Sequence, residues 1–114
     1  MIKRLSIFIF FVLIIVSPKI HALDYSVEGS YSVGKTSCTI EWDNSDKAYK
    51  VYWNEGIGYT LLFYKNELPN GNIVYEEYES TGNTYTGKFT FKDYRYLKGE
   101  YERSDGKSFT VRKR

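Results

Sequence analysis

The stretch TYTGKFTFKDYRYLKGEY, residues 84–101, decides the fold class of this 114-residue chain. In its first half, apolar or small residues alternate with Thr and Lys, at Tyr85, Gly87, Phe89 and Phe91. A period of two residues is that of a half-buried β-strand. Lys92 and Asp93 then form a tight link to a second segment, whose residues on one face are Leu97, Gly99 and Tyr101. The stretch therefore predicts two consecutive strands.

Segments of the same kind continue towards both ends of the chain. Turn-forming pairs separate them, among them Gly34-Lys35, Asn70-Gly71 and Asp105-Gly106. No helical periodicity of useful length follows residue 22. We expect eight short strands, near residues 25–33, 38–42, 49–53, 59–65, 72–79, 85–91, 97–101 and 109–111. Short links between consecutive strands predict an all-β, antiparallel up-and-down meander.

A repeated Gly-x-aromatic unit indicates how this sheet is shaped. It occurs as Gly29-Ser30-Tyr31, Gly87-Lys88-Phe89 and Gly99-Glu100-Tyr101. Glycine inside a strand is costly unless something fills its space, and an aromatic ring of a neighbouring strand commonly does so. The same glycines allow the coiling that a sheet needs to close on itself. We expect residues 23–114 to form one domain, a closed or nearly closed β-barrel. The alternative is an open, coiled sheet or a small sandwich.

The N-terminus has the pattern of an export signal. Lys3 and Arg4 precede a run from residue 5 to residue 16 that is apolar apart from Ser6, and Ala22 offers a small residue for cleavage. The run is shorter than the roughly 20 apolar residues that a membrane-spanning helix needs. We therefore expect residues 1–22 to be a signal peptide, with no stable membrane anchor after cleavage. An uncleaved anchor is the alternative. The predicted location is secreted or periplasmic.

Removing residues 1–22 changes the charge balance. They hold three of the 16 Lys and Arg residues, and all 14 Asp and Glu residues follow them, so the mature chain has a formal net charge of −1. The basic character of the whole chain thus belongs largely to the signal, and nucleic acid is not an expected partner. The cluster Arg112-Lys113-Arg114 is interpreted as a solvated strand end rather than a docking site.

The counts of cysteine and histidine exclude several mechanisms. His21 is the only histidine and lies in the predicted signal, while Cys38 is the only cysteine. The mature chain therefore lacks a Cys-His dyad, a Ser-His-Asp triad and the usual Cys and His ligands of zinc. We expect no catalytic residue, no metal site and no cofactor. Cys38 shares a strand face with Ile40 and Trp42 and is expected to be buried, and a dimer through Cys38 is the alternative.

Acidic residues are interpreted structurally. Glu76 and Glu77 lie on opposite faces of one strand, so they share no local site, and we expect salt links with lysines rather than glycosidase chemistry. The loop with Asp43, Asn44 and Asp46 lacks the Gly and distal Glu of a calcium loop and is interpreted as a turn.

Aromatic residues are the best candidates for binding. The mature chain holds 12 Tyr and 2 Trp, more rings than the inside of a small barrel needs. Tyr gives a large contact area with a polar tip at low entropic cost. Alternation places Tyr52, Tyr64 and Tyr78 on the face opposite Trp53 and Phe63. The candidate ligand- or partner-binding residues are Tyr52, Trp53, Tyr59, Tyr64 and Tyr78. The alternative is that these rings only cover the sheet surface.

The spacing of these features is similar to that of a known group. A Gly-x-Tyr first strand, an apolar third strand ending at Trp53 with a Gly56-x-Gly58 link, and a late Gly-x-aromatic strand resemble the small exported calycin-like barrels of bacteria. That group includes avidin-like and lipocalin-like folds, and periplasmic barrels that inhibit lysozymes have a similar outline. The resemblance implies a closed barrel. It implies no ligand or target, because neither an avidin-like biotin site nor the cysteine-tied loops of lysozyme inhibitors are present.

The sequence thus predicts an exported, non-catalytic binding protein, an inhibitor or interaction module of the bacterial envelope. The expected partner is a protein, a glycan or a small molecule. The alternative is a carrier that holds a small molecule inside the barrel. An enzyme is not expected.

Overall fold

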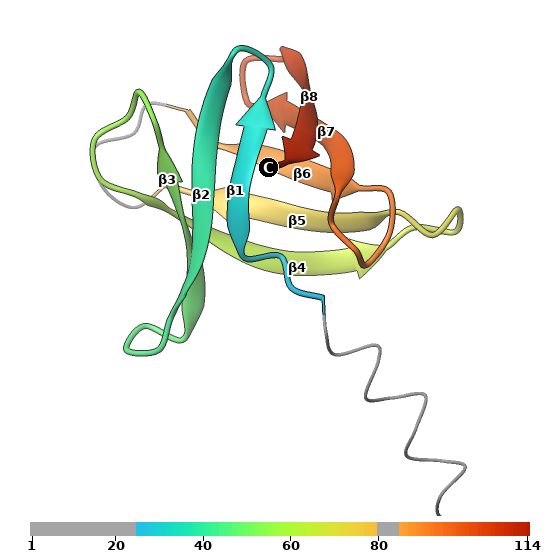
Figure 1. Cartoon of the computed structure of the whole chain (residues 1–114), viewed down its shortest axis with the longest axis horizontal. Helices are drawn as coiled ribbons and strands as arrows, with labels where there is room; N and C mark the ends of the chain where they lie inside the picture. The colour runs from blue at the N-terminus through green and yellow to red at the C-terminus, as the bar shows by residue number, and fades with distance from the viewer. Residues whose placement is uncertain (1–24, 80–84) are drawn as a thin grey trace, which may run out of the picture.

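A computed structural model describes residues 25–79 and 85–114, so the predicted signal peptide lies outside the described residues. None of the described residues forms a helix long and apolar enough to cross a lipid bilayer. The described residues form eight strands (Figure 1), which are β1 (Gly29–Val33), β2 (Thr36–Asp43), β3 (Ala48–Trp53), β4 (Thr60–Glu67), β5 (Ile73–Tyr78), β6 (Gly87–Phe91), β7 (Lys98–Arg103) and β8 (Ser108–Lys113). The all-β prediction is confirmed.

The eight strands close into a barrel. Each strand pairs antiparallel with the next along the chain, and β1 pairs with β8 to complete the ring. That closing ladder is short, running from Tyr31↔Lys113 to Val33↔Val111. The closed, up-and-down barrel expected from the turn signals and glycine spacing is therefore confirmed. In this topology the β1–β2, β3–β4 and β7–β8 links lie at one end of the barrel, where β5 ends and β6 begins, and we call this end the mouth.

Inward-facing side chains fill the middle of the barrel and the part away from the mouth. Phe89 and Phe91 stack with ring centroids 5.7 Å apart, and Tyr31 lies against Phe91 at 5.7 Å. The fully buried side chains include Ile40, Val51, Leu62, Ile73 and Val111. Most of these positions follow the alternation read from the sequence. These side chains form one buried cluster in the interior of the barrel.

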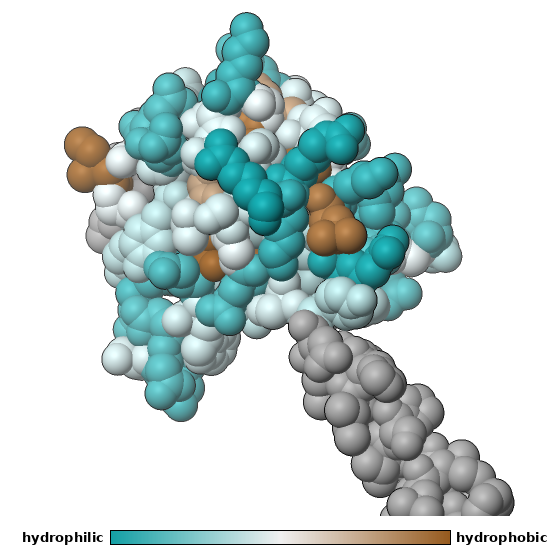
Figure 2. Space-filling view, in the orientation of Figure 1, coloured by the Kyte–Doolittle hydropathy of each residue, from teal (hydrophilic) through white to brown (hydrophobic). Residues whose placement is uncertain are grey.

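Alternation did not predict the exposure of three apolar residues. Trp42 and Leu97 lie near strand ends beyond the packed core and are exposed. Phe63 faces outward, because Leu62 takes the inward position of β4. Figure 2 shows that the visible face, over β1, β2 and β8, is mostly hydrophilic, with apolar side chains scattered singly. Scattered apolar residues of this kind are normal on a soluble surface.

The end of the barrel opposite the mouth is plugged by the segment before β1. Val27 is buried there, and its carbonyl accepts a hydrogen bond of 2.7 Å from the hydroxyl of Tyr31. Lys113 Nζ donates to the carbonyl of Ser26 at 2.8 Å. These contacts hold the chain across the base of the core.

Two strand glycines are needed for space, as expected. A Cβ on Gly87 would lie 2.5 Å from Cζ of Tyr101, so a neighbouring ring fills that position. At Gly99 the space is filled instead by the backbone of Thr90 and Phe91 on β6. The prediction of a covering ring is thus confirmed at Gly87 and is wrong at Gly99, where the two strands themselves approach closely.

Cys38 is buried in the core, as predicted, with 2% of its surface exposed. Burial raises the pKa of its thiol to about 12, and the nearby Glu77 contributes in the same direction. The thiolate, which is the reactive form, is therefore scarce at neutral pH.

We expect Cys38 to react with a thiol reagent at pH 8 about a hundredfold more slowly in the folded protein than in urea. The raised pKa also makes the free energy of unfolding depend on pH. The unfolded thiol loses its proton near pH 8.5 while the folded one keeps it, so the folded protein becomes less stable above that pH. The stability gained from burying the protonated Cys38 thiol is fully present below pH 8.5 and is lost as the pH rises towards about 12. Melting temperatures from pH 7 to 11 check it, and Cys38→Ala should show a smaller alkaline fall. Rapid labelling of the folded protein would contradict the prediction.

Candidate functional site

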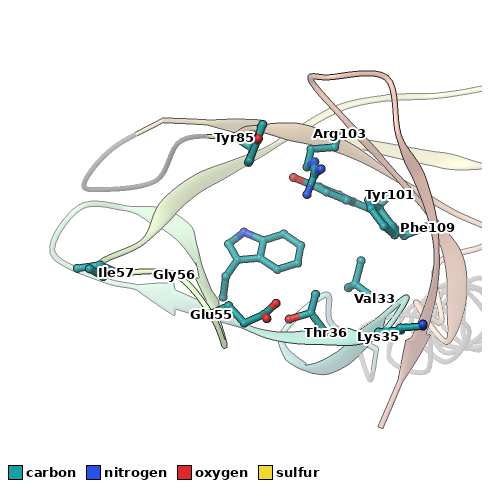
Figure 3. A pocket seen from close by; sticks show the side chains of 11 residues that line it. Val33, Lys35, Thr36, Glu55, Gly56, Ile57, Tyr85, Tyr101, Arg103 and Phe109 are labelled. Carbon is teal, nitrogen blue, oxygen red and sulfur yellow. The ribbon is translucent and has the colours of Figure 1, made fainter.

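The mouth of the barrel holds a pocket of about 620 Å³ (Figure 3). Its side chains come from the β1–β2 turn, the β3–β4 loop, Tyr85 ahead of β6, and the β7–β8 hairpin. A volume of 300–1,000 Å³ is typical of sites for small molecules. The pocket is therefore large enough for a small organic ligand.

The pocket exists because two pairs of strands separate before they reach the mouth. β3 pairs with β4 only from Tyr49 to Val51, so Trp53 extends past the end of that ladder. β5 pairs with β6 only as far as Glu76↔Lys88. With the backbone ladders ended, side chains must hold this part of the barrel together.

Glu77 provides that connection from inside the barrel. Its side chain, 5% exposed, points inward just beyond the last β5–β6 pair. One carboxylate oxygen accepts hydrogen bonds from Trp53 Nε1 at 2.7 Å and from the hydroxyl of Thr60. The other accepts from the hydroxyl of Tyr101 at 2.5 Å. The carboxylate thus joins β3, β4 and β7 to β5 beneath the pocket.

This arrangement corrects the expectation for the acidic residues. Glu76, on the outer face, pairs with Lys65 at 2.9 Å, as predicted. Glu77 bonds to three neutral donors instead of a lysine. The reason is that the interior at this level offers indole and hydroxyl groups. Buried charge is tolerated when several hydrogen bonds replace its hydration.

The floor and one wall of the pocket are aromatic. The indole of Trp53 stacks on Phe89 with centroids 6.1 Å apart and planes inclined by 16°. Trp53 lies 5.0 Å from Tyr101, and Tyr101 lies 6.5 Å from Phe109. Burial and Glu77 raise the pKa of Tyr101, so its hydroxyl remains a hydrogen-bond donor. These rings pack against one another and offer flat apolar surfaces.

Arg103 brings positive charge into the same wall. Its guanidinium lies 4.2 Å from the ring centre of Tyr85 and 5.4 Å from that of Phe109. Asp105 accepts from Nε at 3.0 Å and from Nη2 at 2.8 Å. The hydrogen bond from Arg103 lowers the pKa of Asp105 to about 2, so the pair stays ionised. Tyr85 and Asp105 therefore fix the guanidinium in one orientation.

The opposite wall is polar. Figure 3 shows Glu55 and Thr36 across the pocket from Arg103 and Tyr85. The hydroxyl oxygen of Thr36 is buried and has no hydrogen-bond partner among the residues that the structure describes. A buried hydroxyl without a partner costs about 1–3 kcal/mol.

Of the five residues predicted for binding, only Trp53 lines the pocket. Tyr52 and Tyr59 lie together elsewhere, with ring centroids 6.0 Å apart, and Tyr78 lies 5.5 Å from Phe63 on the outer face. Tyr64 contacts Tyr75 edge-on at 5.7 Å. The structure therefore divides the predicted set among several places.

Sequence reasoning missed Arg103, Thr36 and Glu77 as pocket or floor residues. A signal for Arg103 was present, because it follows Gly99 and Tyr101 at spacing of two and so faces inward on β7. Thr36 precedes Cys38 and Ile40 in the same way on β2. The two-residue alternation along β7 and β2 was therefore sufficient to place Arg103 and Thr36 on the inner face.

No protein-family model, curated protein or solved structure matches this chain. Within residues 25–79 and 85–114, no group of three or more His, Cys, Asp or Glu side chains is arranged to hold a metal ion.

Proposed function

We propose that this protein is an exported, non-catalytic binding protein that takes a small ligand into the mouth of its barrel. The observation that carries this proposal is the pocket of about 620 Å³, which four aromatic rings line together with Lys35, Thr36, Glu55 and Arg103. Apolar and aromatic side chains that surround a few placed polar groups are typical of ligand sites. The packed core below supports binding at the mouth rather than deeper in the barrel.

Two observations support export and binding over catalysis. The charged and apolar pattern of residues 1–22 is that of a signal peptide. In the pocket, Tyr101 is kept protonated and Arg103 is paired with Asp105, so both are suited to donating hydrogen bonds rather than to attacking a substrate.

The test uses the two tryptophans, which lie at opposite ends of β2–β3. Trp53 is in the pocket, while Trp42 pairs with Tyr49 far along the ladder from Trp53. In Trp42→Phe, a panel of small aromatic compounds should change Trp53 emission saturably and raise the melting temperature. In Trp53→Phe, the remaining Trp42 should not respond. No saturable change with any compound would contradict the proposal.

An envelope interaction module or inhibitor is the second candidate. It is favoured by the exposed rings on the outer face, where Phe63 and Tyr78 pack edge-on. Phe63→Ser with Tyr78→Ser should abolish capture of a protein or glycan partner and leave ligand binding at the mouth unchanged. Retained capture by this variant would count against the outer face.

A further inference from the structure

The positively and negatively charged side chains at the mouth differ in how far they are exposed to water, and this difference affects which ligand charge the pocket favours. Arg103 is the enclosed cation, with 25% of its side chain exposed. Glu55 lies on the opposite wall in the exposed β3–β4 loop, where water screens its charge. Lys35 adds a second positive group at the rim. Asp105 offsets part of the charge of Arg103, so what the guanidinium offers a ligand deep in the pocket is mainly its remaining N–H donors, while the carboxylate of Glu55 lies out in water.

Glu77, the buried anion below the pocket, does not reverse this balance. Its two oxygens already accept three hydrogen bonds, two of them from the pocket-lining residues Trp53 and Tyr101. The carboxylate is bonded to the polar edges of these rings and does not itself line the pocket. These donors stabilise its negative charge, which lies beneath the rings of Trp53 and Tyr101.

The guanidinium keeps donors for a ligand after pairing with Asp105. That pair uses Nε and one proton of Nη2, and a guanidinium has five N–H groups. The fork geometry suits a planar acceptor with two oxygens. The ring of Phe109 lies beside the guanidinium, the ring of Tyr101 lies beside that of Phe109, and both line the pocket. An acceptor at Arg103 is therefore next to a surface for a flat apolar body.

We propose that the mouth pocket binds a planar aromatic carboxylate, with its acid group on Arg103 and its ring against Trp53, Tyr101 and Phe109. This inference rests on the proposed function of the pocket. The carboxylate adds charge-assisted hydrogen bonds to the guanidinium, and the ring removes apolar surface from water. A ligand with only the acid group would not contact the rings, and a ligand with only the aromatic ring would not bond to Arg103.

Isothermal titration calorimetry with matched probes tests the inference. The probes are 2-naphthoate, its neutral amide 2-naphthamide, and the non-planar cyclohexanecarboxylate. We expect 2-naphthoate to bind about tenfold more tightly than either of the others, since only it combines the charge with the flat ring. In Arg103→Gln, affinity for 2-naphthoate should fall about tenfold while that for 2-naphthamide stays within about twofold.

Arg95→Gln is the matched control. Arg95 also pairs with an Asp two residues away, Asp93, at 3.2 Å, but in the β6–β7 link at the other end of the barrel. It should leave the affinity for every probe unchanged. Equal affinity of wild-type protein for the acid and the amide, or equal weakening of both by Arg103→Gln, overturns the inference while leaving the pocket as a binding site. Absence of binding by every probe overturns both the inference and the proposed function.

Discussion

Replacing Glu77 with alanine is expected to destabilise the folded protein by about 4 kcal/mol, a large share of the 5–15 kcal/mol typical of a small domain. The substitution removes the acceptor for Trp53, Thr60 and Tyr101. Each buried donor left unsatisfied costs about 1–3 kcal/mol, and relief from burying a carboxylate offsets part of the sum. Urea unfolding measured by circular dichroism provides the free energy.

The neighbouring residue provides the control. Glu76→Ala removes a carboxylate from the same strand, but its partner Lys65 is exposed, so we expect a loss below about 1 kcal/mol. Should Glu77→Ala fail to fold, Glu77→Gln and Tyr101→Phe retain the shape of the site. A double-mutant cycle between them should give a coupling of about 1 kcal/mol or more. Equal effects of Glu76→Ala and Glu77→Ala would show that the buried network contributes nothing.

The strand pattern was predictable because each strand has one face in the core. Phe89 and Phe91 alternate with polar residues and are both buried, so they identify the inner face of β6. The turn predicted at Asn70-Gly71, between β4 and β5, also forms, and Gly71 N donates to the carbonyl of Leu68 at 2.9 Å. The prediction failed where strands pass beyond the core, as at Trp42 and Leu97. In such places nothing covers the side chain, so its position in the two-residue alternation no longer decides whether it is buried.

The site was less predictable because it depends on contacts between distant strands. The three donors to Glu77 lie 17 to 24 residues away along the chain. Nothing local to β5 distinguishes Glu77 from a carboxylate that pairs with a surface lysine. The position of the pocket depends in turn on where the β3–β4 and β5–β6 ladders end, and strand alternation does not set those ends. Trp53 was found because a large ring at a strand end is conspicuous in the sequence.

Gly99→Ala should be the most damaging single-methyl addition to the barrel, with an expected loss of about 3 kcal/mol. A Cβ at this position would lie 2.9 Å from Cα of Phe91 and closer still to the carbonyl oxygen of Thr90. Both atoms belong to the backbone of β6, and Gly99 pairs directly with Phe91, so relief requires the two strands to separate. The φ angle of Gly99 is not in the left-handed region, so the cost is steric.

Gly106→Ala separates this collision from the general effect of replacing glycine. Gly106 has φ of +92° in the β7–β8 turn, and a Cβ there would meet nothing within 4 Å. Its cost is therefore backbone strain alone, about 1–2 kcal/mol. Thermal unfolding of both variants gives the comparison. We expect Gly99→Ala to melt lower than Gly106→Ala and to lose hydrogen-exchange protection first along β6 and β7, because the collision lies between these two strands. A Gly99→Ala protein as stable as the wild type would mean that β6 and β7 can move apart at little cost. The rigid wall that holds Tyr101 and Arg103 in the pocket would then lack its support.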